Sequence, residues 1–176
     1  MKLRFDESEI QYWACKYVND LNEEETLQEE ELLALELKIK ARGYLLKDEL
    51  VKVAKWKWPP GRPAALAQEN SDDHIKDVTS KAFQLTDIDD SLKVLRSDYG
   101  GLRGVLAPIG SAILHLYHKD PYPIYDPHAL RAVGERKGRG VWRRYVKYCR
   151  ELVAQNEVDI RTLDRALWKY SKGKNS

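Results

Sequence analysis

Apolar side chains recur at intervals of three and four residues along most of the chain, which is the spacing of one side of an α-helix. No run alternates apolar and polar residues in the manner of a half-buried strand. The pattern therefore predicts an all-α fold, built as a compact multi-helix domain. The expected helical stretches are 8–18, 26–43, 46–58, 63–70, two that begin at 71 and 86, 108–118, 127–133, 141–155 and 159–171.

Residues at the expected helix ends support this pattern. Thr26 and Glu29 have the spacing of a capping box, in which two side chains bond free backbone N–H groups of the first turn. Ser71 and Thr86 are expected to cap the helices that follow them, because a hydroxyl oxygen accepts the same kind of bond. The proline pair that begins at Pro59 is expected to stop the third helix.

One carboxylate, Asp126, directly precedes Pro127 in the stretch PIYDPHALRAVG. Aspartate accepts bonds from first-turn N–H groups and proline suits the first helical position, so the local pattern predicts that Asp126 caps a short helix. Gly134 is expected to end that helix. The other interpretation is a catalytic carboxylate. The local pattern alone favours the cap.

Length and composition set broad limits. At 176 residues the chain can bury most of its apolar surface in one domain, and its 43% hydrophobic and 33% charged residues are typical of a globular protein. No apolar run approaches the roughly 20 residues that span a bilayer, and the first ten residues lack the apolar core of a signal peptide. Cys15 and Cys149 match no zinc or iron–sulfur spacing. We therefore expect a cytoplasmic protein with reduced thiols, no cofactor and no membrane partner.

Charge is distributed unevenly along the sequence. Residues 1–46 hold 6 Lys/Arg and 11 Asp/Glu, residues 47–130 hold 11 and 12, and residues 131–176 hold 13 and 5, so the net charges are −5, −1 and +8. The C-terminal cluster RAVGERKGRGVWRRYVKYCR offers many cations to a phosphate backbone. A solvated helix face is the alternative explanation for such a run.

Two stretches, LRGVLAPIGSAIL and YPIYDPHALRAVG, share positions with a hairpin motif of the form L-P-G-V-G-x-K-T-A and with an aspartate-containing segment that follows it by roughly eighteen residues. On these residues the chain resembles the helix-hairpin-helix DNA glycosylase superfamily over about 101–134. The matching positions are Leu102, Gly104 and Val105 in the hairpin, and Pro123, Ile124, Asp126, Arg131 and Gly134 in the second segment.

The resemblance implies a specific role for Asp126. In that family the target base is flipped out of the duplex, and an aspartate at the start of a helix stabilises the cationic sugar that forms as the glycosidic bond breaks. Asp126 can therefore be both cap and catalyst. Four aromatic side chains could stack on an extruded base, although most buried tyrosines and tryptophans are core residues: Tyr117, Tyr122, Tyr125 and Trp142.

The departures from the family motif also carry predictions. Hairpins of the family hold DNA phosphate through backbone N–H groups exposed by two glycines, here Gly104 and, at the second position, Leu106. Pro108 lies where bifunctional members carry a Schiff-base lysine, eighteen residues before the aspartate. The resemblance therefore implies a monofunctional enzyme without lyase chemistry. The four-cysteine cluster of some relatives is absent.

DNA binding is expected to depend on the hairpin and on the basic C-terminal helices, residues 135–172. The candidate DNA-binding residues are Gly104, Leu106, Arg136, Lys137, Arg139, Arg143 and Arg144. Among alternatives, His115, His118 and His128 could contribute to a metal site, but no acidic residue has a matching helical spacing, and we predict no metal. Trp56 and Trp58 could wedge between stacked bases, yet a tryptophan before a helix-breaking proline pair more commonly packs inside.

Two functions of different classes follow from these features. The first is a base-excision-repair-type glycosylase that uses Asp126 to hydrolyse a glycosidic bond in DNA. The alternative is a non-catalytic module that binds nucleic acid or protein and retains Asp126 only as a cap. An open pocket lined by aromatic side chains beside Asp126 would favour the enzyme, and a filled one would favour the binding module.

Overall fold

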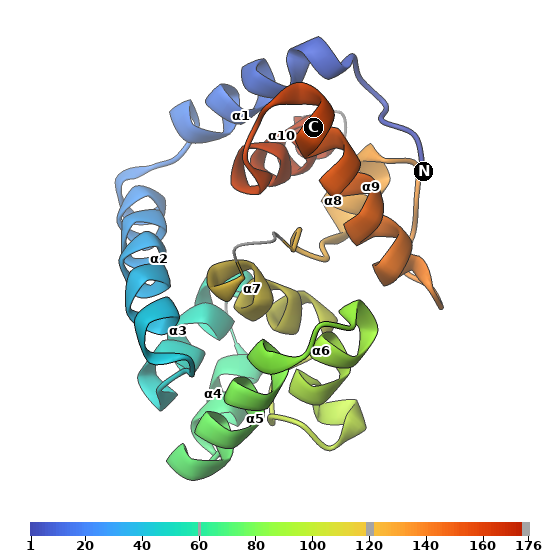
Figure 1. Ribbon diagram of the computed structural model, residues 1–176. Coiled ribbons are helices and arrows are strands. Elements are labelled where there is room, and N and C mark those ends of the chain that lie inside the picture. The colour runs from blue at the N-terminus through green and yellow to red at the C-terminus, as the bar shows by residue number, and fades with distance from the viewer. Residues whose placement is uncertain (60, 119–121, 174–176) are drawn as a thin grey trace. The chain divides into compact units, whose positions relative to one another are not determined.

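A computed structural model describes residues 1–59, 61–118 and 122–173 (Figure 1). These residues form ten α-helices and two short 3-10 helices, and their only extended pairing is one isolated bridge between Arg96 and Leu102. The prediction of an all-α fold is confirmed. The elements are η1 (Glu7–Glu9), α1 (Ile10–Asn19), α2 (Glu23–Arg42), α3 (Lys47–Lys57), α4 (Arg62–Gln68), α5 (Asp72–Gln84), α6 (Ile88–Leu95), η2 (Ser97–Tyr99), α7 (Ala107–Tyr117), α8 (Pro127–Ala132), α9 (Val141–Asn156) and α10 (Ile160–Gly173).

Two compact units can be distinguished within the 1–176 domain expected from the sequence. Unit 1 comprises Met1–Thr26 and Pro121–Ser176, and unit 2 comprises Leu27–Asp120. Unit 2 is thus inserted in sequence between the two parts of unit 1. As a result, the hairpin residues belong to unit 2 and Asp126 belongs to unit 1.

The apolar centre of unit 2 is α7. Eight of its 11 residues are buried, and it packs against α3, α5 and α6. Gly110 allows α6 to lie close, because a Cβ atom there would be 2.9 Å from Leu92. Even this strongly apolar helix is short, and no helix in the described part of the chain is long and apolar enough to cross a membrane.

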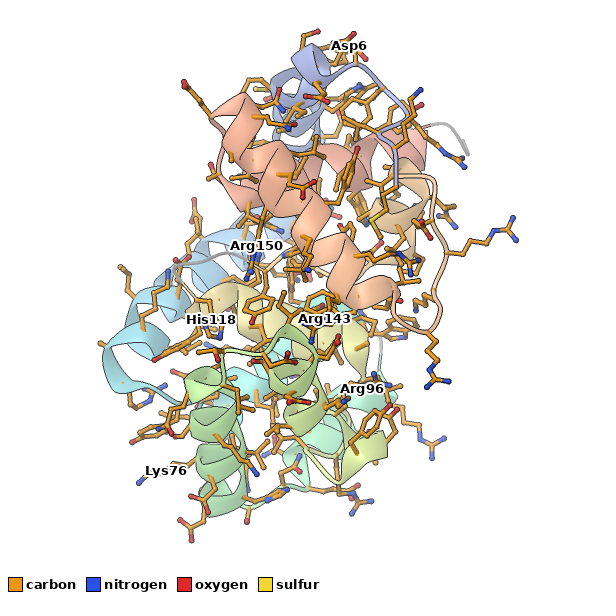
Figure 2. The ribbon with its side chains drawn as sticks, turned by 45° about the vertical axis from the view of Figure 1, so that its right-hand side comes forward. Asp6, Lys76, Arg96, His118, Arg143 and Arg150 are labelled. Carbon is orange, nitrogen blue, oxygen red and sulfur yellow. The ribbon has the colours of Figure 1, made fainter. Side chains whose placement is uncertain are left out.

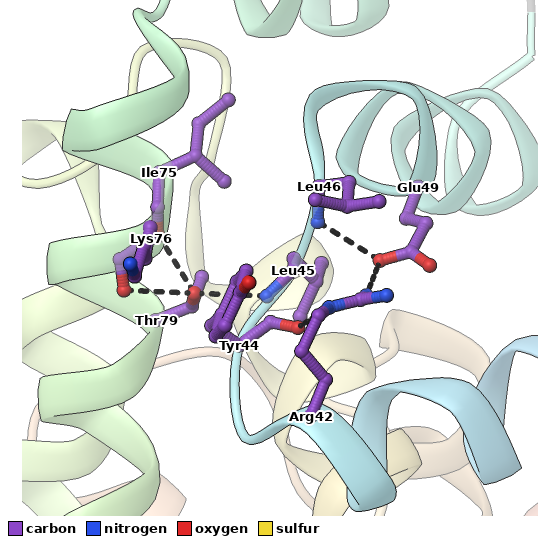
Figure 3. A network of polar contacts seen from close by, with 8 residues as sticks. All are labelled: Arg42, Tyr44, Leu45, Leu46, Glu49, Ile75, Lys76 and Thr79. Carbon is purple, nitrogen blue, oxygen red and sulfur yellow. Dashed lines mark hydrogen bonds and ion pairs between the residues drawn. The ribbon is translucent and has the colours of Figure 1, made fainter.

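The turn between α2 and α3 is fixed by buried polar contacts (Figure 3). Glu49 forms an ion pair with Arg42 and accepts a hydrogen bond from the N–H of Leu46 at 2.9 Å. The N–H of Leu45 donates to the hydroxyl of Thr79 on α5, at 3.1 Å. Glu49 and Thr79 are both buried, and their bonds satisfy polar groups that would otherwise be left without water.

Unit 1 is built around α10, which packs against α1 and α8. The N-terminal segment is tied to the end of α8 by two backbone hydrogen bonds, Lys2 N to Val133 O at 3.0 Å and Arg4 N to Ala132 O at 2.9 Å. The first residues of the chain therefore help to hold α8, the helix that Asp126 precedes.

The start of α2 differs from the prediction. The helix begins at Glu23, and its reciprocal cap is formed by Asn22 and Glu25: Glu25 N donates to Asn22 Oδ1 at 2.9 Å and Asn22 N donates to Glu25 Oε2 at 3.0 Å. The capping box predicted at Thr26 and Glu29 is therefore wrong. Asn is an equally good cap that occurs one turn earlier, and the acidic run allows either start.

Other predicted helix ends agree more closely. Ser71 caps α5 by accepting a bond from the N–H of His74 at 3.3 Å, as expected. The prediction for α6 is off by one residue, because Asp87 rather than Thr86 supplies the cap. The third helix ends before Pro59, which confirms the stop.

Candidate functional site

Asp126 ends an extended segment and caps α8. Its side chain accepts a hydrogen bond from the backbone N–H of His128 at 2.7 Å, and Pro127 is the first helical residue. Gly134, with a φ of +75°, lies just past the helix, as the sequence predicts. The carboxylate is only 9% exposed. The cap prediction is confirmed, and the same residue is a buried carboxylate.

The segment before Asp126 is held by a second buried carboxylate that the sequence analysis did not single out. Asp164 on α10 accepts a hydrogen bond from the N–H of Ile124 at 3.3 Å and forms an ion pair with Arg161 at 2.8 Å. Asp164 lies 40 residues from Ile124 in sequence, so no local pattern could indicate this contact.

Two buried side chains of α9, Tyr145 and Cys149, feel the charge of these carboxylates. Burial, followed by the nearby charge of groups that include Asp164 and Asp126, raises the pKa of the Tyr145 hydroxyl well above its ordinary value. Burial also raises the pKa of the Cys149 thiol. Both groups are therefore neutral near pH 7, and Cys149 is not poised as a nucleophile.

Three of the four predicted base-pocket residues come together in unit 1. Tyr122, Tyr125 and Trp142 are all buried. Tyr122 is stacked on Trp142, with ring centroids 5.9 Å apart, and Tyr125 meets Trp142 edge-on at 5.8 Å. The guanidinium of Arg150 lies 5.0 Å from the centre of the Tyr122 ring. These contacts agree with the interpretation of the three rings as core residues. That they stack on an extruded base stays a prediction.

The fourth predicted pocket residue, Tyr117, belongs to unit 2. It is stacked on Phe83 with ring centroids 3.8 Å apart and an angle of 4° between the rings. This pair joins the end of α7 to the end of α5 within unit 2. The stack on Phe83 is a contact within unit 2. The assignment of Tyr117 to a base pocket stays a prediction.

The hairpin between η2 and α7 is packed tightly against α4. Leu102 and Val105 are fully buried, and Gly104 has a φ of +81°. A Cβ atom at Gly104 would clash with the Pro63 carbonyl and the Ala67 N–H group, so both the backbone angle and the space require glycine. The role of Gly104 toward DNA stays a prediction.

Leu106 follows Gly104 and precedes α7. Its side chain is 53% exposed, and α7 begins without a side-chain cap. Because Pro108 has no N–H, the first turn of α7 offers one donor fewer than usual to an anion.

The basic residues after Asp126 form a loop and the start of α9. Arg136, Lys137 and Arg139 are exposed in the loop between α8 and α9, and Arg144 is exposed on the first turns of α9. Arg143 is half-buried on the same helix, where Figure 2 shows it together with Arg150. We use the name basic loop for three cations of the loop together with two on the adjoining turns of α9: Arg136, Lys137, Arg139, Arg143 and Arg144.

The loop between α8 and α9 is anchored to Tyr125, one of the three buried rings of unit 1. The N–H of Gly138 donates to the hydroxyl of Tyr125 at 3.4 Å, and Arg144 lies 3.7 Å from Glu135. Gly134 and Gly140, at the two ends of the loop, both have left-handed backbone angles. The loop therefore holds several positive charges in the same unit as Asp126.

The remaining candidates have other surroundings. Within the described residues, no three His, Cys, Asp or Glu side chains come together as a metal site. His128 Nδ1 accepts a hydrogen bond from Arg131 at 2.8 Å.

Trp56 lines a hollow of about 530 Å³ between α2 and α3, and Trp58 is 50% exposed. The expectation that both tryptophans pack inside is therefore wrong for Trp58, which follows the last turn of α3.

Comparisons with known proteins return no match. No family model matches the chain, and no curated protein or solved structure matches it. The functional interpretation therefore depends on the residues of this chain and on the motif resemblance at 101–134.

Proposed function

We propose that this protein binds DNA and excises a damaged base by a monofunctional route that uses Asp126. The observation that carries the proposal is the placement of Asp126. It is a buried carboxylate at the start of a helix, at the position that corresponds to the catalytic aspartate of the family motif. The bond from His128 N and the positive end of α8 both stabilise its negative charge.

The proposed reaction is hydrolysis of an N-glycosidic bond. The C1′–N bond breaks, the base leaves with the bonding electrons and takes up a proton, and water adds its hydroxide to C1′. Positive charge develops on the sugar in the transition state, and a fixed carboxylate in a water-poor site stabilises that charge. Asp126 would supply this carboxylate, since it is largely withdrawn from solvent.

Pro108 supports the monofunctional part of the proposal. A lyase reaction requires a side-chain or terminal amine that forms an imine with the ribose aldehyde. A proline within the chain has no such amine, and Pro108 is buried in α7. The product of excision would therefore be an intact abasic site.

The basic loop would supply most of the affinity for DNA. Its exposed arginines and lysine can displace counterions from the phosphate backbone, whereas the acidic first third of the chain cannot. The hairpin would contribute less than in the family motif, because the second glycine is replaced by Leu106.

A screen of duplexes that each contain one modified base tests the proposal. Each duplex is incubated with the protein and then treated with alkali, which cleaves the strand at abasic sites. Strand cleavage that requires both the protein and one modified base supports the proposal. Binding without cleavage across the panel contradicts the enzymatic part.

One observation favours the second candidate, a non-catalytic binding module. Tyr122 already stacks on Trp142 and contacts the guanidinium of Arg150, so a base that stacked in either place would have to displace that side chain. In a binding module Asp126 would act only as the cap of α8. DNA binding with no excision from any modified duplex would favour this candidate.

A further inference from the structure

The helix α2 carries apolar residues on two opposite sides. One side is buried and consists of Leu32, Leu35 and Ile39. On the other side Leu27, Leu33 and Leu37 are 61%, 52% and 75% exposed. A helix that is apolar on both sides is normally covered on both sides, because removal of exposed leucines from water lowers the free energy of the protein.

The exposed side has a regular pattern. Leu27, Glu30, Ala34, Leu37 and Ala41 follow one another at intervals of three and four residues, the spacing of a helix–helix seam. Leu33 lies beside this line, one turn before Leu37. We call these six positions the outer face of α2, and all six are exposed.

Two opposite charges, Glu30 on the outer face and Lys38 beside it, lie at equal distances in sequence from Ala34. Glu30 lies four residues before Ala34, and Lys38 lies four residues after it. Both side chains are exposed, and neither has an ion-pair partner among the residues that the structure describes. They are eight residues apart on one helix, about 12 Å along its axis, so they cannot pair with each other.

We propose that the outer face of α2 is the contact surface between two copies of this chain, with the two α2 helices antiparallel about a two-fold axis at Ala34. In this register Glu30 of each copy faces Lys38 of the other, and Leu27 faces Ala41. The small side chains of Ala34 meet at the axis and allow the helices to approach closely. Leu33 and Leu37 of both copies form one cluster of four leucines.

The charges on α2 select the antiparallel arrangement. Glu23, Glu24 and Glu25 lie in its first turn, whereas Lys40 and Arg42 in its last turn already form ion pairs with Glu36 and Glu49 of the same chain. A parallel pair would place the acidic ends side by side, where like charges repel. An antiparallel pair keeps the two acidic ends apart and pairs Glu30 with Lys38 twice, once on each side of the axis.

Sedimentation velocity over a range of protein concentrations tests the contact. The full chain should sediment as a dimer of 20.4 kDa subunits, and Leu37→Glu should sediment as a monomer at the same concentrations. Val18→Glu on α1, where Val18 is 47% exposed, is the matched control and should remain dimeric. A wild-type chain that is monomeric throughout, or a Leu37→Glu variant that is still dimeric, would overturn the proposal.

A charge exchange tests the register and does not alter the leucines. Glu30→Lys and Lys38→Glu should each raise the dissociation constant about tenfold, because each places two like-charged pairs across the contact. The double variant should return close to the wild-type value, since the facing charges are opposite again. Circular dichroism checks that helix content is unchanged. Failure of the double variant to recover would rule out the antiparallel register.

Discussion

Asn70 and Arg103 are joined by two hydrogen bonds, although they are 33 residues apart in sequence. The N–H of Arg103 donates to Asn70 Oδ1 at 2.9 Å, and Asn70 Nδ2 donates to the Arg103 carbonyl at 3.1 Å. Asn70 is buried two residues after the end of α4, and its amide also donates to Ala67 O at 2.8 Å. One side chain therefore fixes the backbone of the hairpin immediately before Gly104.

Replacement of Asn70 should destabilise the protein. Asn70→Ala leaves the N–H and the carbonyl of Arg103 without their partner, and we expect a loss of about 2 kcal/mol. The midpoint of thermal unfolding, followed by circular dichroism, should fall by about 6 °C. The control is Gln68→Ala, because Gln68 is exposed two residues earlier. Equal midpoints for the two variants would show that the bond pair is dispensable.

Local pattern in the sequence was sufficient for most helices of this fold. Strong apolar periodicity predicted the segments that became α5, α7, α9 and α10, because each buries one side in its unit. The start of α2 was wrong because several capping residues precede an acidic run in which any turn can begin the helix. The division of the chain into two units left no signal in the local sequence pattern, since it depends on contacts between residues far apart in sequence.

The candidate site shows the same contrast between local and long-range information. The Asp-Pro pair predicted that Asp126 caps a helix, which is a local bond between neighbours. Asp164 and Asn70 were missed because their partners are 40 and 33 residues away. Trp58 was expected inside, but α3 ends at Lys57 and the Trp58 side chain is exposed. Spacing along the chain does not reveal such contacts.

The two cysteines should differ sharply in reactivity. Burial raises the pKa of the Cys149 thiol and also excludes reagents, whereas Cys15 is exposed on α1. A disulfide reagent should therefore label one thiol per chain in the folded protein and both after unfolding in guanidinium. Cys15→Ser, as the control, should abolish the rapid labelling. Rapid labelling of two thiols in the folded protein would contradict the buried state of Cys149.

The salt dependence of DNA binding should identify the basic loop. If Arg136, Lys137 and Arg139 each contact a phosphate, their joint replacement with Gln should reduce the slope of log affinity against log salt by about 2.7. The control replaces Lys76, Lys81 and Lys93 of α5 and α6 with Gln, an equal change in charge, and should leave the slope unchanged. An unaltered slope in the first variant would show that this surface is not the DNA site.

Covalent trapping should give a negative result. Borohydride reduces an imine between a protein amine and an abasic ribose to a stable adduct, and Pro108 cannot form that imine. We therefore expect no protein–DNA adduct after incubation with abasic DNA and borohydride. An enzyme with a known Schiff-base lysine serves as the positive control. A robust adduct would contradict the monofunctional route and direct attention to a lysine such as Lys119, which lies outside the described residues.

Two substitutions at Asp126 separate its structural role from its proposed chemical role. Asn caps a helix about as well as Asp but carries no charge, so Asp126→Asn should leave stability nearly unchanged, while Asp126→Ala should cost about 1 kcal/mol through the lost bond to His128 N. On a modified duplex that the wild-type protein cleaves, Asp126→Asn should still bind but lose excision by orders of magnitude, because a neutral amide cannot stabilise a cationic sugar. Thermal unfolding and single-turnover excision measure the two effects. Wild-type excision rates in a folded Asp126→Asn variant would reduce Asp126 to the cap of α8.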